Sequence, residues 1–304
     1  MGEKLLYIIN PRSGKAEIKN HLLFAIDTFI KGGFDVSVRT TQSKGDAMDF
    51  VKMHGEGFDR IVVSGGDGTV NEVLNGIMTL KKKPTLGVVP AGTTNDYAYS
   101  LGIPGNMQQA AEIAAAGMPF PIDVGLFNDR YFTYVAGFGA LTEVTYKTPQ
   151  DAKNVLGRTA YILEGIKRLS SIKYSHIRLE YDGGVIENDY IIGLFTNSVS
   201  IAGFRNALGG SKLDDGLLEI TLIKMPTKLE EIQTIINVLM DIEQTRGVHT
   251  DFLTFLTTSK VRVVSGEPME WTIDGEGTGA VKDVTIKNCH RVLSVLRSPD
   301  AATL

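Results

Sequence analysis

The most constraining feature of this chain is a glycine-rich segment between a β-branched run and a helical pattern. The run Ile61–Ser64 precedes it, the pattern Val70–Leu80 follows it, and its residues are Gly65, Gly66, Asp67, Gly68 and Thr69. Glycines let main-chain N–H groups approach a ligand with no Cβ in the way, and a helix start adds unpaired N–H groups that favour phosphate. The acid within the loop, Asp67, suits a nucleotide site, where a carboxylate coordinates Mg²⁺ or accepts hydrogen bonds from a ribose. The alternative is a plain turn between strand and helix.

This segment matches neither of the two most familiar phosphate-binding fingerprints. No stretch of the chain reads G-x-x-x-x-G-K-[ST]. The spacing G-x-G-x-x-G fails in this loop because Asn71 stands where the third glycine is needed. The sequence therefore disfavours P-loop ATPases and Rossmann dehydrogenases.

Length and composition narrow the class of protein. A chain of 304 residues is long enough for two domains of ordinary size, and a formal charge of −4 argues against a dedicated nucleic-acid binder. No apolar stretch reaches the ~18–20 residues of a membrane span, and the N-terminus leads directly into strand-like Leu5–Ile9, unlike a signal peptide. A single cysteine, Cys289, excludes an internal disulfide and suits a reducing compartment. We expect a cytoplasmic globular protein.

The chain divides into two patterns near Asp123. Before it, alternating patterns predict a largely parallel sheet with helices on its faces. The expected strands are 5–9, 34–38, 61–64 and 85–89, and the expected helices are 18–30, 46–53, 70–80, 93–101 and 107–116. After it, two helices (159–171 and 228–244) interrupt strands at 130–135, 176–181, 185–197, 217–224, 261–264, 271–274 and 281–287. These strands predict an antiparallel sandwich or barrel-like domain, and a cleft between domains is the default place for a site.

Two further loops follow strands in the same way as the glycine-rich segment. They are 10–15, containing Asn10, Pro11, Arg12, Ser13, Gly14 and Lys15, and Pro90–Asp96. Open α/β sheets bind ligands at the carboxyl ends of their strands. Each loop alone also fits a plain turn, and Thr93 or Thr94 also fits a helix cap. Three polar loops after three strands favour a shared phosphate site.

Five motifs occur in order along nearly the whole chain. They are Asn10-Pro-x-Ser-Gly, Gly65-Gly-Asp-Gly-Thr, Gly92-Thr-x-Asn-Asp, Ile122-Asp-Val-Gly and Asp274-Gly-Glu. In this ordered set the sequence resembles the diacylglycerol kinase catalytic-domain family, most closely the soluble bacterial diacylglycerol kinases. Sphingosine and ceramide kinases are more distantly similar, and NAD kinases and 6-phosphofructokinases share the Gly-Gly-Asp loop.

The resemblance implies an α/β + β fold. An NAD-kinase/phosphofructokinase-like α/β nucleotide-binding domain, residues 1–127 with a C-terminal tail near 290–304, would precede an antiparallel β-sandwich lipid-substrate domain, residues 128–289. The residues on matching positions that would line the ATP site or orient its phosphates and metal are Asn10, Pro11, Arg12, Ser13, Gly14, Thr41, Gly65, Gly66, Asp67, Gly68, Thr69, Asn71, Glu72, Thr94, Asp96 and Asp123.

The resemblance also implies the chemistry of two acidic turns. The family's general base falls on Glu276, with Asp274 assisting through a metal–water network, while Asp67 manages phosphate and metal. The family's metal loop falls on 211–217, where the carboxylate of Asp215 and the carbonyls of Lys212 and Leu217 would hold Mg²⁺. Without the family, both segments fit ordinary turns. The cation that contacts the γ-phosphate stays open between Arg12, Lys15 and Lys19.

The function implied by the resemblance is ATP- and Mg²⁺-dependent phosphorylation of diacylglycerol to phosphatidic acid. The enzyme would attach peripherally to the inner face of the membrane, with a homodimer as an option. Basic residues between 153 and 173 fit docking on anionic lipid, although solvated surface charge explains them more simply. The alternatives are a kinase of the same fold for phosphatidylglycerol, a sphingoid base or, least of these, NAD. A non-catalytic nucleotide-binding regulator is disfavoured because Glu276 and Asp215 are both present.

Overall fold

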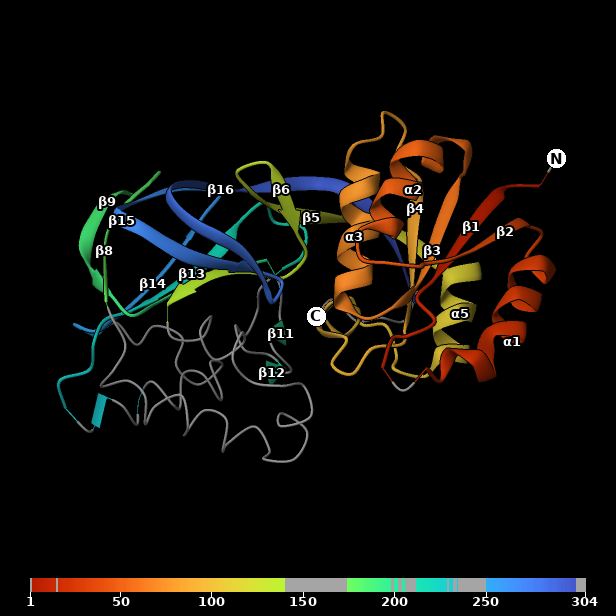
Figure 1. Ribbon diagram of the computed structural model, residues 1–304, viewed down its shortest axis with the longest axis horizontal. Coiled ribbons are helices and arrows are strands. Elements are labelled where there is room, and N and C mark those ends of the chain that lie inside the picture. The colour runs from red at the N-terminus through yellow and green to blue at the C-terminus, as the bar shows by residue number, and fades with distance from the viewer. Residues whose placement is uncertain are drawn as a thin grey trace.

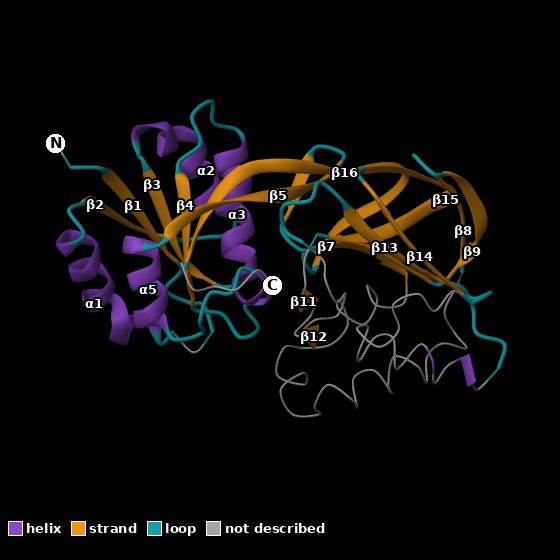
Figure 2. Cartoon of the chain, turned by 180° about the vertical axis from the view of Figure 1, so that it is seen from behind, coloured by secondary structure: helices purple, strands orange, loops and turns teal. Residues whose placement is uncertain are grey.

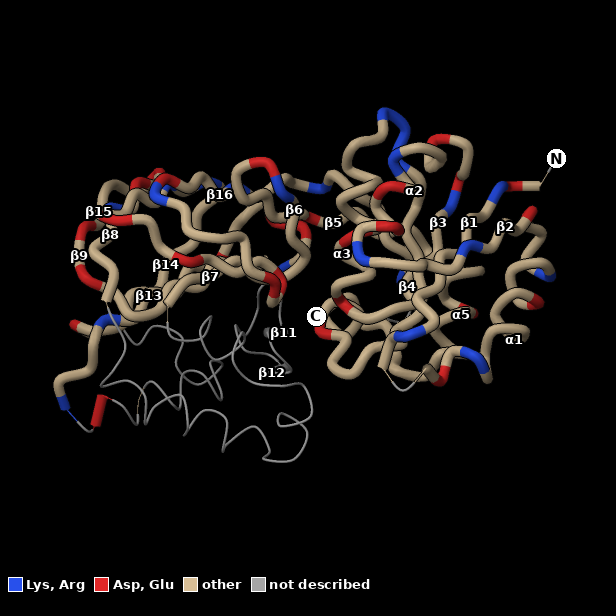
Figure 3. Tube along the Cα trace, in the orientation of Figure 1, with Lys and Arg blue, Asp and Glu red and all other residues tan. Residues whose placement is uncertain are grey.

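The computed structural model describes residues 2–14, 16–139, 174–197, 200–201, 204–205, 212–228, 230–231, 234 and 250–298. They form two lobes, one of helices around a parallel sheet and one of antiparallel strands (Figures 1 and 2). Charged positions of both signs are interspersed over both lobes (Figure 3). None of the helices in these ranges is both long enough and apolar enough to span a bilayer. Lys15, the predicted helix 159–171, the basic residues between 153 and 173 and most of the predicted helix 228–244 lie outside the described residues.

The first lobe alternates strands and helices, which confirms the predicted α/β class. Its strands are β1 (Lys4–Ile9), β2 (Asp35–Thr40), β3 (Arg60–Gly65) and β4 (Thr85–Pro90). Its helices are α1 (Ile18–Lys31), α2 (Asp46–His54), α3 (Asp67–Met78), α4 (Asp96–Ser100) and α5 (Met107–Ala116), with a 3₁₀ turn at Gly55–Gly57. The strands are parallel in the order β4-β3-β1-β2. Helices α1 and α5 cover one face and α2 and α3 the other (Figure 2).

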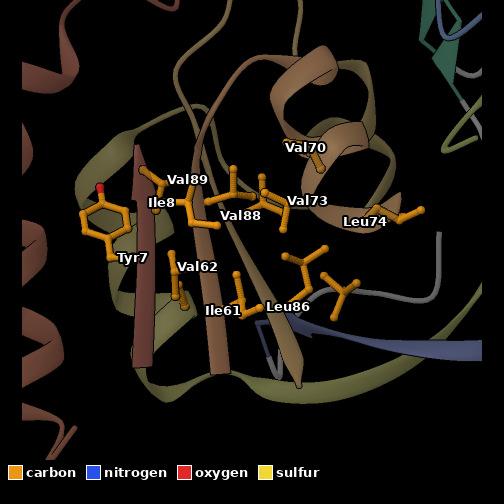
Figure 4. Packing of buried hydrophobic residues seen from close by; sticks show 14 of the residues in the cluster. Tyr7, Ile8, Ile61, Val62, Val70, Val73, Leu74, Leu86, Val88 and Val89 are labelled. Atoms are coloured by element: carbon orange, nitrogen blue, oxygen red, sulfur yellow. The ribbon is translucent and has the colours of Figure 1, made fainter. Parts of the chain in front are cut away.

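Apolar side chains fill the space between this sheet and its helices. Ile8, Val62 and Val88 are buried on the strands, and Val73 and Leu74 of α3 pack in the same cluster (Figure 4). Parallel strands that are covered on both faces bury every position, so β1, β3 and β4 are continuous apolar runs and do not alternate. The strands end at one edge of the sheet, where the three predicted loops begin.

The second lobe is antiparallel, as the sequence predicts. Its strands are β7 (Val135–Gly139), β8 (Ser175–Tyr181), β9 (Gly184–Tyr190), β10 (Ile192–Thr196), β13 (Leu218–Ile223), β14 (Leu253–Thr258) and β15 (Lys260–Ile273), and a separate pair joins β11 (Ser200–Ile201) to β12 (Phe204–Arg205). The ring of Trp271 lies in the core of this lobe. The rings of Phe127, Phe138 and Phe195 surround it at centroid distances of 5.1, 5.0 and 5.5 Å.

Two long strands connect the lobes (Figure 1). Strand β16 (Glu276–Arg297) pairs with β15 over its first half and with β5 (Met118–Phe127) over its second half. Near its end, Val295 pairs in parallel with Leu86 of β4. Apart from the β11–β12 pair, the described strands of both lobes therefore share one fourteen-stranded sheet. Strand β5 leads into β6 (Arg130–Phe132), which returns beside it.

The structure corrects several strands expected from the sequence. The pattern misses β5 and β14, joins β9 to β10 as 185–197, joins β6 to the start of β7 as 130–135, and splits β15 into 261–264 and 271–274. Pro119 and Pro121 hide β5, because prolines interrupt a strand pattern. The prolines are tolerated because β6 pairs with β5 only from Gly125 onward. In the described structure, the edge of β5 that faces β6 is therefore unpaired at Pro119 and Pro121.

Two helices begin at residues other than those expected. Helix α3 begins at Asp67 and not at Val70, because the extended backbone that continues from β3 ends at Gly66. Helix α4 begins at Asp96 and not at Thr93, because Asn95 has a left-handed φ of +55°. Neither threonine of that loop therefore caps α4. Asp67 and Gly68 belong to the first turn of α3.

The contact between the loops after β3 and β4 gives a test of this packing. A Cβ on Gly92 would lie 2.6 Å from the Cα of Gly66 and 2.8 Å from Oδ1 of Asn95. We expect Gly92→Ala to lower the free energy of unfolding by about 1–3 kcal/mol, the usual cost of overpacking. Gly105→Ala is the control, because its Cβ would meet nothing within 4 Å. Equal urea midpoints for the two variants would contradict this packing.

Candidate active site

The three predicted loops meet at the carboxyl-terminal edge of the parallel sheet. The N–H of Gly66 donates to Oγ of Ser13 at 3.2 Å. The N–H of Ala91 donates to the carbonyl of Gly65 at 2.9 Å. Gly14 has a left-handed φ of +53°, and a Cβ there would lie 2.5 Å from the carbonyl oxygen of Ala91. The chain thus requires glycine where the first loop passes the third.

Asn10 joins the first loop to α3. Its Nδ2 donates to Oγ1 of the buried Thr69 at 3.0 Å, and its Oδ1 accepts from the N–H of Arg12 at 3.0 Å. The side chains of Arg12 and Lys19 are exposed near this loop, whereas Lys15 lies outside the described residues. The choice among these three cations stays open.

The segment 41–46 lies against the same edge. The N–H of Thr41 donates to the carbonyl of Ile9, the last residue of β1, at 2.9 Å. The N–H of Gly45 donates to Oε1 of Glu72 at 2.8 Å. These two bonds bring Thr41 and Glu72, both predicted for the ATP site, to the edge where Asn10 begins its loop.

Asp67 is the acid in the first turn of α3. Its Oδ1 accepts from the N–H of Tyr97 at 3.0 Å, which ties α3 to α4. Burial raises the pKa of Asp67 to about 6; the N–H of Tyr97 opposes this rise and the charge of the buried Asp96 adds to it. A cation at this site would reverse the shift, since an opposite charge favours the ionised carboxylate. Thr94, in the same loop as Asp96, is exposed.

Asp274 accepts hydrogen bonds from donors of both lobes. Its Oδ2 accepts from Nδ2 of Asn71 and from the N–H and Oγ1–H of Thr133, each at 2.7 Å. Its Oδ1 accepts from the N–H groups of Tyr134 and Val135 at 3.0 and 3.1 Å. Burial raises the pKa of Asp274, and the main-chain and side-chain donors oppose that rise by favouring the ionised form. This buried carboxylate therefore fixes the position of α3 against the strand lobe.

Tyr134 lies against the turn that carries Asp274 and Glu276. Its side chain is buried, and a Cβ on Gly275 would lie 3.8 Å from its hydroxyl oxygen. Burial, with the charges of Asp274, Asp67 and nearby acids, raises the pKa of Tyr134 well above its ordinary value. The phenol therefore stays protonated and offers a hydrogen-bond donor among carboxylates.

Glu276 begins β16 directly after the turn that contains Asp274. Its Oε2 lies 3.0 Å from Nζ of Lys44 and 3.0 Å from Nη2 of Arg130. A Cβ on Gly68, in the first turn of α3, would lie 4.0 Å from its Oε1. Burial raises the pKa of Glu276, but the hydrogen bonds and charges of the two cations outweigh burial, so its pKa lies below the ordinary value. The predicted base therefore faces the start of α3 as an ionised carboxylate.

A cavity of about 390 Å³ lies between the lobes beside Glu276. Lys44, Asn71 and Glu72 line it from the side of α2 and α3, and Arg130 lines it from β6. Its size falls within the range of small-molecule sites. The cavity suits a polar, charged ligand, because its lining combines three cations, four carboxylates and two amides: Lys44, Lys52, Arg130, Glu72, Asp129, Asp274, Glu276, Asn71 and Asn75.

The predicted metal loop lies on a turn before β13, with Lys212 at the start of its described part. Asp215 is exposed, and its Oδ1 accepts from the N–H of Leu217 at 3.0 Å. The carbonyl of Leu217 accepts from Nδ2 of Asn288 at 2.9 Å and keeps a second lone pair. Within the described ranges no three His, Cys, Asp or Glu side chains gather around one point. One carboxylate with carbonyl oxygens nevertheless fits a hard cation such as Mg²⁺.

Asp123 ties this loop to β16. Its Oδ2 accepts from the N–H of Gly216 at 2.6 Å and its Oδ1 from the N–H of Arg291 at 2.8 Å. Its own N–H donates to the carbonyl of Leu213 at 2.7 Å. The carboxylate is buried, and both of its oxygens serve main-chain donors. Its predicted place in the ATP site stays a prediction.

Sequence reasoning misses three side chains of this centre. Lys44 lies within the segment that the family motif singles out for Thr41, and that proximity is a usable signal. Arg130 and Tyr134 carry no local signal, because the acids bound by the Arg130 side chain and by the Tyr134 main-chain N–H lie 146 and 140 positions away along the chain. Only the folded chain brings them together.

Comparison with known proteins assigns the family. A model of the diacylglycerol kinase catalytic domain matches residues 4–127, and a model of the YegS C-terminal NAD kinase beta sandwich-like domain matches residues 135–297. A diacylglycerol kinase of Bacillus subtilis is 36% identical over 299 residues, which cover 97% of this chain and 96% of that protein. This chain belongs to the diacylglycerol kinase family. It is therefore a lipid kinase, with the α/β and β-sandwich architecture expected from the sequence.

Further relatives agree with this family. A diacylglycerol kinase of Staphylococcus aureus is 33% identical over 303 residues, 99% of this chain and 94% of that protein. A Bacillus anthracis protein provisionally titled a diacylglycerol kinase has a solved structure with a TM-score of 0.82 and 26% identity, covering 100% of this chain and 97% of that one. A structure titled as a Bacillus anthracis diacylglycerol kinase has a TM-score of 0.78 over 100% of this chain and 99% of that one. At 24% identity, this last likeness supports the fold alone.

Removal of the Asp274 carboxylate should destabilise the kinase strongly. Asp274→Ala would leave the donors of Asn71, Thr133 and the following residues buried without an acceptor. We expect a loss of about 3 kcal/mol or more, since each orphaned buried donor costs ~1–3 kcal/mol. The control, Asp251→Ala, removes an exposed carboxylate and should change stability by less than about 0.5 kcal/mol. Similar urea unfolding curves for the two variants would show that the buried network contributes little.

The raised pKa of Asp67 predicts a pH-dependent stability. The folded carboxyl holds its proton up to about pH 6, whereas the unfolded chain releases it near the ordinary pKa of 3.8. The folded state therefore binds more protons between these values, and this group reduces stability as the pH rises through them. Relative to Asp67→Asn, the wild type should lose up to about 3 kcal/mol of unfolding free energy between pH 4 and pH 7. Urea titrations at both pH values measure this difference, and an unchanged difference would contradict the raised pKa.

Proposed function

We propose that this lipid kinase transfers the γ-phosphate of ATP to the hydroxyl of diacylglycerol and forms phosphatidic acid. The observation that carries the proposal is the position of Glu276, whose carboxylate faces Gly68 in the first turn of α3 from across the cavity. A proton acceptor and a phosphate-binding helix start lie on facing sides of one cleft. The names of the Bacillus subtilis and Staphylococcus aureus relatives support diacylglycerol as the acceptor.

We propose that the triphosphate lies along the start of α3. Its contacts would come from the three loops and the segment after β2, that is, from Asn10, Pro11, Arg12, Ser13, Gly14, Thr41, Gly65, Gly66, Asp67, Gly68, Thr69, Asn71, Glu72, Thr94, Asp96 and Asp123. The hydrogen bonds between the loops support this assignment for the members that they join. Main-chain N–H groups at the very start of α3 would donate to the bound anion.

The base need not be strong. Glutamate has an ordinary pKa of ~4.3, far below that of an alcohol, so it cannot ionise the lipid hydroxyl in advance. Phosphoryl transfer passes through a loose transition state, and the proton leaves late. Glu276 would orient the hydroxyl toward the γ-phosphate and accept the proton as the new bond forms. Asp274 would assist through the metal–water network, and its hydrogen bonds to Thr133 and Tyr134 hold the turn that carries Glu276.

We propose Mg²⁺ as the metal. Bound to the nucleotide, Mg²⁺ supplies charge neutralisation for the transferred phosphoryl group. Asp67 would manage that ion and the phosphates, and its raised pKa marks it as a carboxylate that gains from a neighbouring cation. Asp215 with the carbonyls of Lys212 and Leu217 would hold a structural Mg²⁺ in the strand lobe.

The setting of the reaction is part of the same proposal. A diacylglycerol substrate implies that the enzyme meets a membrane surface, and we propose peripheral attachment to its inner face by a cytoplasmic protein.

We also propose that the chain divides into two domains, one of residues 1–127 with the tail near 290–304 and one of residues 128–289. Pairing of Val295 with Leu86 supports assignment of the tail to the first domain. A homodimer stays a prediction from the family.

Replacement of Glu276 tests the assignment of the base. Glu276→Gln keeps the size of the side chain and should lower kcat on diacylglycerol by ~10²–10⁴-fold, the usual contribution of a positioned base. The assay follows phosphatidic acid made from radiolabelled ATP and diacylglycerol micelles. Glu267→Gln, an exposed glutamate on β15, is the matched control and should keep the wild-type rate. Wild-type turnover by Glu276→Gln would refute this role.

The acceptor itself is tested with a total lipid extract. Mass spectrometry of the phosphorylated products should give phosphatidic acid as the main product. Phosphorylated phosphatidylglycerol or a phosphorylated sphingoid base would instead assign the kinase to another lipid alcohol. Binding of ATP with no phosphorylated lipid would favour a non-catalytic regulator.

A further inference from the structure

One ion pair in the site joins the two lobes across the cavity. Lys44 precedes α2 in the helical lobe, and its Nζ lies 3.0 Å from Oε2 of Glu276 in the strand lobe. Arg130 shares the same oxygen at 3.0 Å, but it lies on β6, which pairs with β5 beside β16 (Figure 1). The Lys44 side chain is 75% exposed and that of Arg130 is 38% exposed. Lys44 is thus the partner that is freer to move.

The same lysine lies beside the proposed triphosphate site. The N–H of the next residue, Gly45, is bound to Glu72 on α3 at 2.8 Å, so the backbone next to Lys44 is held against that helix. Glu276, its partner, faces Gly68 in the first turn of α3. A phosphate chain at this helix start would lie within reach of the flexible lysine side chain and would compete with Glu276 for it.

We propose that Lys44 is a triphosphate-binding residue that Glu276 holds in the ligand-free protein and releases when the nucleotide enters. A nucleoside triphosphate carries several negative charges against the single charge of the carboxylate, so the ammonium group passes to the phosphates. Glu276 then remains in an ion pair with Arg130 only. Since Lys44 is one of the two cations that lower the pKa of Glu276, its departure restores proton affinity to the base at the moment when the phosphate donor is in place. The inference rests on the proposed use of ATP and adds Lys44 to Arg12, Lys15 and Lys19 as a phosphate cation.

The test is a double-mutant cycle on nucleotide binding. Calorimetry with ATP and Mg²⁺, without lipid, gives Kd for the wild type, Lys44→Met, Glu276→Gln and the double variant. Lys44→Met should weaken binding by about fivefold or more, within the range of a charge-assisted contact. Glu276→Gln should tighten binding, because the lysine is no longer held. This tightening should be at least about threefold larger with Lys44 present than in the Lys44→Met background, as expected for two contacts that compete.

Simple repulsion between Glu276 and the phosphates gives a different result. It would tighten binding by the same factor in both backgrounds, and equal factors would overturn the proposal. Lys44→Arg should keep most of the affinity. Lys82→Met is the control for loss of a surface ion pair, because Lys82 is 71% exposed and lies 3.0 Å from Asp59, outside the cavity; its Kd should equal that of the wild type. Absence of ATP binding by the wild type would overturn the proposed function as well, whereas binding without coupling would overturn the Lys44 inference alone.

Discussion

The buried carboxylate of Asp274 is the interaction on which the site depends. Its two oxygens accept five hydrogen bonds, from Asn71 on α3 and from residues 133–135, which lead from β6 into the start of β7. Asp274 itself has a left-handed φ of +48°, followed by Gly275 at +79°. A non-glycine residue in this conformation costs energy, which the bonds of its side chain offset. The turn thereby carries Glu276 back toward the start of α3.

Around this network the environments of the acids differ. Burial leaves Asp67 with a raised pKa, while two cations leave Glu276 with a lowered one. Separation of pKa values within one cluster is typical of sites that divide roles among carboxylates. Asp67 is suited to lose its proton when a cation binds beside it. Glu276 stays ionised and available as an acceptor.

The first lobe was largely predictable because its signals are local. Continuous apolar runs, helical spacing and glycine-containing loops at strand ends led to β1, β3, β4 and the site edge. Prediction failed for strands whose pairing strands are distant in the sequence. Strand β5 is hidden by prolines that only an unpaired edge tolerates, and β16 is much longer than its local pattern, since β4 and β5 supply its partners.

The sequence by itself determined the strand–loop–helix units, the glycines that let the loops approach one another, and the acids available for chemistry. Short-range sterics and side-chain periodicity are sufficient for these features. Only the tertiary structure decided that Asn71 bonds Asp274 across 203 positions, that Asp123 serves main-chain donors of two distant segments, and that Lys44 and Arg130 meet at Glu276. Such contacts depend on the packing of the lobes, and no local pattern encodes which charges that packing brings together.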